Sequence, residues 1–187
     1  MARARAFALL VAACLIGACT TVPPAAPRPI GVGQQDEPFI VEGRLSARHG
    51  AEAIAANFRW THVSGVDTIT LGTPLGQTVA KLSGSGGGTR IERSDGSFAE
   101  AADWESLTER ALGVPLPVAG LTYWIRGYPR PAFEYSIESD AAGRPLVLRQ
   151  DGWEIIYGYA EDASPLPARL RMNWPDVDLR IAIDGWH

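Results

Sequence analysis

The sequence predicts a mainly β fold of the α+β kind, in which a curved antiparallel sheet or partial barrel carries two helices on its concave side. Apolar and polar residues alternate along about eleven short segments between Phe39 and Trp186, as in half-buried strands. Two segments in the middle of the chain instead repeat apolar residues at helical spacing. Because both helices are short and amphipathic, they must lie on a larger apolar surface.

The strand pattern is clearest at the start of this region. Phe39–Arg48 and Ala53–His62 each put apolar residues on one face and charged or polar residues on the other. Asp95-Gly96 is a hairpin turn signal, and Ser83–Gly88 is predicted to be a flexible loop. The remaining predicted strands are 66–73, 77–83, 89–93, 133–138, 146–150, 153–157, 166–173 and 178–184.

The two helices are predicted over Ala99–Leu112 and Val118–Arg126. Gly113 follows the first as a C-terminal cap, and Gly127 follows the second. Acidic residues of the first helix fall on the side opposite to its apolar stripe, as expected for a solvated face.

The chain begins with a predicted signal peptide, residues 1–18. Arg3 and Arg5 precede the apolar run Phe7–Gly17, which is too short to span a bilayer. The run ends in small residues before Cys19, which resembles the lipobox of bacterial lipoproteins. By that resemblance Cys19 becomes the diacylated and N-acylated first residue of the mature chain. Cys14 is a weaker candidate, and an ordinary secretory signal is the alternative.

Residues 19–38 contain the lipidated cysteine and a linker with five prolines, and residues 39–187 form one domain. Cys14 and Cys19 are the only cysteines, so the domain can form no internal disulfide and no cysteine metal site. Without Arg3 and Arg5, 15 basic residues stand against 21 acidic ones, a net charge of −6. This charge disfavours nucleic acid as a partner, and membrane attachment would depend on acyl chains.

No catalytic constellation is present in the sequence, so we expect neither an enzyme nor a cofactor. The histidines are His49, His62 and His187, and none has metal-ligand spacing. His62 ends a strand, where a histidine at the rim or surface is the expected placement. The glycine-rich Ser83–Gly88 lacks the Lys-Ser/Thr of a phosphate loop.

The loop Pro74-Leu75-Gly76 carries an apolar residue where a turn normally carries a polar one. Full exposure of a leucine forgoes roughly 1.5–3 kcal/mol of burial. Leu75 therefore either folds back onto the core or protrudes to touch something apolar.

Aromatic and aliphatic residues gather on the apolar faces of the predicted elements. They form either an ordinary core or the lining of a cavity between sheet and helices, and periodicity cannot separate the two. The candidate lining residues are Phe58, Trp60, Leu121, Trp124, Tyr135, Trp153, Ile155, Tyr157, Met172, Ile181 and Ile183.

Together, these motifs resemble the LolB family of outer-membrane lipoprotein receptors over nearly all of residues 39–187. The Pro-rich stretch before Phe39 leaves little room for the helix that precedes the first strand in that family. The matching residues are Gly43-Arg44-Leu45, Phe58-x-Trp60, Pro74-Leu75-Gly76, Leu116-Pro117, Leu121, Trp124, Gly127, Gln150-x-Gly152-Trp153, Tyr157, Leu166-Pro167, Asp184 and Trp186.

The resemblance implies an unclosed antiparallel β-barrel with a helical lid over an apolar cavity, and no enzyme activity. It implies a monomer, anchored by its lipid in the outer membrane and facing the periplasm. This receptor would accept acylated lipoproteins from the periplasmic carrier LolA and insert them into outer-membrane lipid. Leu75 would then protrude and act in delivery. Two alternatives are a lipoprotein of similar fold that binds another apolar ligand, and a structural outer-membrane lipoprotein.

Overall fold

A computed structural model describes residues 37–161 and 164–187 of the chain. Its described part contains eleven strands and two helices, and every strand segment predicted from alternation is present. The elements, in order, are β1 (Phe39–His49), β2 (Glu52–Val63), β3 (Val66–Gly72), β4 (Thr78–Ser85), β5 (Gly88–Arg93), β6 (Phe98–Ala101), α1 (Trp104–Leu112), α2 (Val118–Trp124), β7 (Tyr135–Ser139), β8 (Pro145–Gln150), β9 (Trp153–Gly158), β10 (Arg169–Trp174) and β11 (Val177–Trp186).

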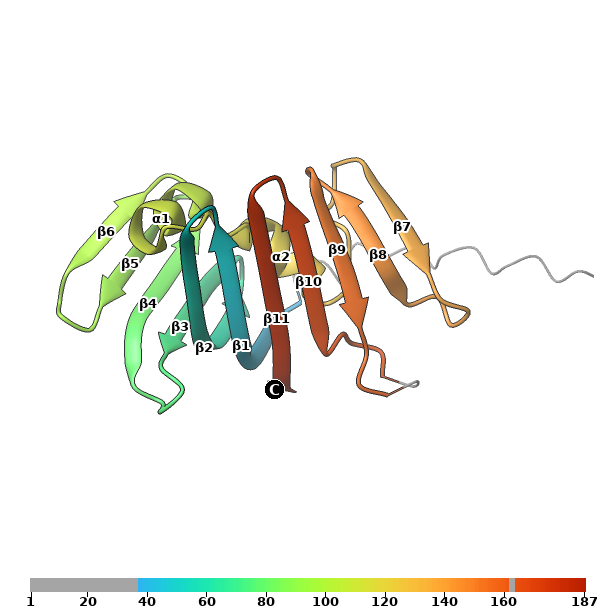
Figure 1. The fold of residues 1–187 in the computed structure, drawn as a ribbon, viewed down its shortest axis with the longest axis horizontal. Coiled ribbons are helices and arrows are strands. Elements are labelled where there is room, and N and C mark those ends of the chain that lie inside the picture. Colours follow the sequence, from blue (N-terminus) through green and yellow to red (C-terminus); the bar gives the residue numbers. More distant parts are fainter. Residues whose placement is uncertain (1–36, 162–163) are drawn as a thin grey trace, which may run out of the picture.

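All eleven strands form one antiparallel sheet in the order β6-β5-β4-β3-β2-β1-β11-β10-β9-β8-β7. The sheet arches around the two helices, and its edge strands β6 and β7 lie at opposite ends (Figure 1). The predicted fold class, an unclosed antiparallel barrel with helices on the concave side, is confirmed.

The first and last strands of the domain pair at the centre of the sheet. Gly43 sits at a bulge in β1, where an added Cβ would collide with the carbonyl oxygen of Ala182. The next residue, Arg44, binds Asp184 of β11 at 2.9 Å. These contacts explain why a glycine and an arginine stand side by side in β1.

Helix α1 begins where Asp103 accepts a hydrogen bond from the backbone N–H of Ser106, at 2.8 Å. It ends at Gly113, whose φ of 77° is left-handed, as predicted for the C-terminal cap. The helix contacts β5 and β6. Trp104 packs against Gly84 of β4 so closely that a Cβ there would lie 2.5 Å from the indole ring.

Two sequence-based predictions of secondary structure were wrong. The first five positions of the predicted helix Ala99–Leu112 do not start a helix, because Phe98–Ala101 pairs with β5 as strand β6. Ser83–Gly88 is largely strand, with β4 reaching Ser85 and β5 starting at Gly88. In both places, pairing with a neighbouring strand outweighs local composition.

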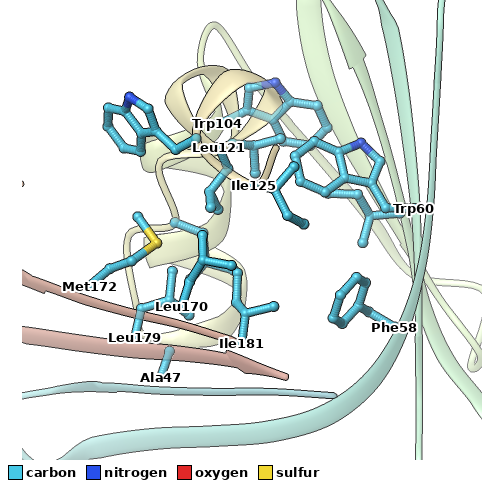
Figure 2. Packing of buried hydrophobic residues seen from close by; sticks show 14 of the residues in the cluster. Ala47, Phe58, Trp60, Trp104, Leu121, Ile125, Leu170, Met172, Leu179 and Ile181 are labelled. Carbon is cyan, nitrogen blue, oxygen red and sulfur yellow. The ribbon is translucent and has the colours of Figure 1, made fainter. Parts of the chain in front are cut away.

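The core lies between the concave face of the sheet and the helices. Leu121 and Ile125, from α2 and its C-terminal end, point toward Trp60, Phe58 and Ile181 on the sheet (Figure 2). The helix therefore covers the central strands with its apolar side, as its spacing predicted.

Candidate functional site

An apolar cavity lies beneath α2, at the centre of the arched sheet. Its free volume is only about 30 Å³, little more than a water molecule needs. The helix and sheet side chains therefore fill most of the space between them. The lining residues are Leu45, Phe58, Trp60, Ile69, Leu71, Leu82, Leu116, Val118, Leu121, Ile125, Leu179 and Ile181.

Four of the predicted lining residues lie on this cavity: Phe58, Trp60, Leu121 and Ile181. The remaining lining residues of the cavity are aliphatic, and most of them lie on strands that the alternation predicted. The same alternation of apolar and polar residues places the side chains of these strand residues on the apolar face. Leucines and isoleucines form most of the lining, whereas about half of the predicted lining residues are aromatic.

A second group of predicted residues forms an aromatic cluster beside the cavity. Trp153 lies between Trp124 and Trp174, with ring centroids 6.4 and 6.1 Å away. The Trp124 indole donates to the buried Gln150 side chain at 2.8 Å, and the same side chain donates to the carbonyl of Arg130 at 2.9 Å. Gln150 thus joins α2, the segment after it and the end of β8 through satisfied hydrogen bonds.

Of the other predicted lining residues, Ile155, Tyr157 and Met172 are buried in the same core, and Ile183 is partly buried against it. The prediction for Tyr135 was wrong, because its side chain is 53% exposed. Tyr135 pairs with the buried Gln150, so it faces the concave side, but it lies on the edge strand β7, and it stays exposed there.

The expected surface placement of His62 was also wrong. His62 is 4% exposed, and its Nδ1 lies 2.8 Å from the carboxylate of Asp67. The indole of Trp60 donates to the same carboxylate oxygen at 2.7 Å, and the ring of Phe39 stacks on His62. The pairing of β2 with β3 brings these residues together, and strand alternation alone does not reveal it.

The loop between β3 and β4 holds Leu75 in the open. A hydrogen bond of 2.9 Å from the Gly76 N–H to the Thr73 carbonyl closes the turn, and Gly76 has a φ of 84°. The Asn57 side chain also donates to the Thr73 carbonyl, at 3.2 Å. Leu75 is 90% exposed, so it protrudes, and the fold-back alternative is wrong. These hydrogen bonds hold the backbone of the turn that presents Leu75 to solvent.

The described residues give no sign of metal chemistry. Within 37–161 and 164–187, no three His, Cys, Asp or Glu side chains gather as a metal site would require. Neither described helix has the length and apolarity needed to cross a bilayer. Cys19 lies outside the described residues. What the described part offers is an apolar interior under a short helix, and one exposed leucine on a fixed turn.

Residues 37–186 match the family model described as outer membrane lipoprotein LolB. The chain belongs to the LolB family. The match spans the whole sheet and both helices, and the family is one of outer-membrane lipoproteins concerned with lipoprotein localisation. The predicted family is thereby confirmed.

Individual LolB-family proteins agree over almost the full length. The outer-membrane lipoprotein LolB of Chromobacterium violaceum is 35% identical, over 95% of this chain and 96% of its own. That of Thiobacillus denitrificans is 36% identical over 91% of each chain.

Solved structures show the same fold at much lower identity. A DUF1329 family protein from Desulfovibrio piger has a TM-score of 0.52 and 9% identity, over 83% of this chain and 88% of its own. A putative outer membrane lipoprotein-sorting protein domain from Vibrio parahaemolyticus has a TM-score of 0.50, also at 9% identity and with the same coverage. At such identity the likeness concerns the fold alone.

Proposed function

We propose that this LolB-family protein accepts acylated lipoproteins from the periplasmic carrier LolA and inserts them into the outer membrane. Its interior would hold the acyl chains, and its exposed loop would act at the membrane. The observation that carries the proposal is a wholly apolar cavity under a short, separate helix, on a sheet with two open edges.

The cavity, at about 30 Å³, is far too small for an acyl chain. Binding therefore requires α2 to move away from the sheet. Helix α2 has seven residues and no side-chain hydrogen bond at its N-terminus, and its hold on the sheet comes mainly from apolar side chains such as Leu121 and Ile125. An acyl chain can replace these contacts with equivalent apolar ones, so opening and binding can nearly balance.

Such an exchange needs no energy source. An acyl group is insoluble in water, so it must pass from one apolar site directly to the next, and the direction follows the relative affinities. LolA, this protein and the membrane would form such a series, with the membrane as the last acceptor.

A transfer assay tests the proposal. The chain starting after Cys19 is incubated with LolA that carries a radiolabelled lipoprotein, and then with liposomes. We expect the label to move first to this protein and then to the liposomes. If the label stays on the carrier, or if it reaches the liposomes equally well without this protein, the proposal is wrong.

The anchor is a separate part of the proposal. We expect Cys19→Ala to abolish acylation of the chain and to release the protein into the periplasm, because two or three acyl chains hold a protein firmly on a membrane. Mass spectrometry and membrane fractionation measure both effects. Cys14→Ala is the matched control and should leave the mass and the fractionation of the mature protein unchanged. Membrane-bound, acylated protein in the Cys19→Ala variant would contradict this assignment.

A further inference from the structure

One polar atom in the apolar interior is not accounted for by folding. The hydroxyl of Tyr157 is buried, and it has no hydrogen-bond partner among the described residues. The residue as a whole is 6% exposed. A buried hydroxyl without a partner destabilises the fold, and phenylalanine would fill the same space without that cost. The hydroxyl therefore needs an explanation other than stability of the closed form.

The sheet register puts Tyr157 in line with the cavity. Tyr157 pairs with Leu170, Leu170 pairs with Ile181, and Ile181 pairs with Leu45. Residues that pair across an antiparallel sheet point to the same face, so all four side chains share the concave side. Ile181 and Leu45 line the cavity. Tyr157 thus lies on β9, two strands away from the cavity-lining Ile181 on β11, in the same row of paired residues across the sheet.

Burial raises the pKa of the Tyr157 hydroxyl well above its ordinary value, so the group stays protonated at neutral pH. A protonated phenol in an apolar site is a hydrogen-bond donor that needs an acceptor. The closed interior supplies none from the described residues, and a hydrocarbon chain would supply none either. A ligand that is apolar but contains oxygen would supply this acceptor.

We propose that Tyr157 donates a hydrogen bond to an ester carbonyl that joins a cargo acyl chain to its glycerol. This inference rests on the proposed function and adds a polar anchor to it. An ester carbonyl is an acceptor only, so it matches a lone donor. The bond would form when α2 moves and acyl chains enter, and it would fix how deep the chains lie.

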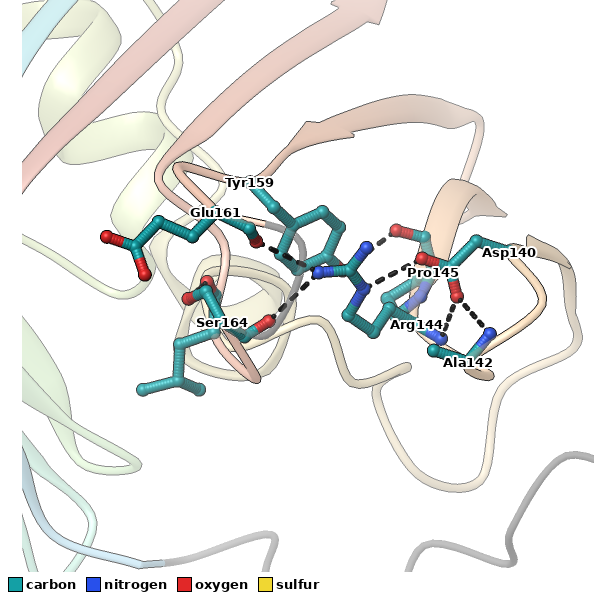
Figure 3. Close-up of polar contacts among 8 residues, drawn as sticks. Asp140, Ala142, Arg144, Pro145, Tyr159, Glu161 and Ser164 are labelled. Carbon is teal, nitrogen blue, oxygen red and sulfur yellow. Dashed lines mark hydrogen bonds and ion pairs between the residues drawn. The ribbon is translucent and has the colours of Figure 1, made fainter.

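Tyr159 provides a matched control two residues away. Its hydroxyl donates to the carbonyl of Pro145 at 2.9 Å, and the guanidinium of Arg144 lies 4.4 Å from its ring centre. Figure 3 shows Arg144 held by Asp140 and by the carbonyls of Glu161 and Ser164. The hydroxyl of Tyr159 therefore already has its partner in the closed form.

The experiment compares two synthetic dipalmitoyl lipopeptides that differ only in the linkage of their chains, one through esters and one through ethers. We expect wild type to bind the ester form about three- to tenfold more tightly, the effect of one neutral hydrogen bond. In Tyr157→Phe this preference should vanish through weaker ester binding, while ether binding stays unchanged. The melting temperature of Tyr157→Phe should be equal or higher. Tyr159→Phe should keep the ester preference and lose stability.

The outcomes separate the two proposals. If wild type binds neither lipopeptide, the proposed function is wrong and the role of Tyr157 is wrong with it. If wild type binds both forms equally, or if Tyr157→Phe keeps the ester preference, only the role of Tyr157 is overturned. The same comparison with ester and ether phospholipids shows whether the carbonyl can also come from membrane lipid, since both lipids contain the same group.

Discussion

Leu75→Glu is expected to leave the protein folded and able to take up cargo, but unable to deliver that cargo to a membrane. Leu75 is 90% exposed, so the carboxylate of the variant stays in water. The melting temperature should therefore change by less than about 2 °C. The cavity under α2 is untouched. Losing the burial of one leucine in lipid, roughly 1.5–3 kcal/mol, corresponds to a fall in delivery of about tenfold or more.

The measurement is transfer of a labelled lipoprotein from this protein to liposomes, alongside its uptake from the carrier. Leu146→Glu is the matched control, because Leu146 on β8 is also exposed, at 42%, and lies outside the loop. It should deliver normally. Normal delivery by Leu75→Glu, or an equal loss in both variants, would show that the loop has no special part in the membrane step.

Leu121→Ala is expected to destabilise the protein and yet bind acyl chains more tightly. Leu121 is 5% exposed and lines the cavity, so truncation should cost about 2–5 kcal/mol of folding free energy. Part of that cost falls on the contact between α2 and the sheet, which must break before an acyl chain enters. Weakening the conformation in which α2 lies on the sheet raises the fraction of molecules that can bind an acyl chain. The affinity for a fluorescent fatty acid should therefore rise about three- to tenfold.

Leu107→Ala serves as the control for this second variant. Leu107 is fully buried on α1 and does not line the cavity. Leu107→Ala should therefore lower the folding free energy by a similar amount, without the gain in affinity for the fatty acid. Thermal unfolding and fluorescence titration give both quantities for each variant. A fall in affinity for Leu121→Ala would mean that the acyl chain does not enter beneath α2.

Strand alternation was enough to predict most of the sheet, because most strands bury one face and expose the other to solvent. It failed at β6, where Phe98–Ala101 contains good helix formers and becomes a strand only by pairing with β5. Helix propensity and the nearby helix α1 favoured the wrong assignment.

The candidate site was harder to predict than the fold. Alternation identifies a buried face but not where along the sheet the helices cover it, so Tyr135 and Phe58 looked alike. The buried pair of His62 and Asp67 depends on the register of a hairpin, which the spacing of single residues does not contain. The turn around Leu75 was predictable, because a proline and a glycine stand on either side of it. The turn alone left open whether Leu75 folds back or protrudes, and only the family resemblance favoured protrusion.

The pairing of β1 with β11 has a consequence for how the chain folds. On either side of this pair, consecutive strands are sheet neighbours, and local hairpins of this kind form within microseconds. The central pair instead joins residues as distant as Arg44 and Asp184, which are 140 positions apart. Closing so long a loop is entropically costly and slow. The two halves of the arch can thus form early as separate meanders, and the seam at the middle of the sheet would be the last to close.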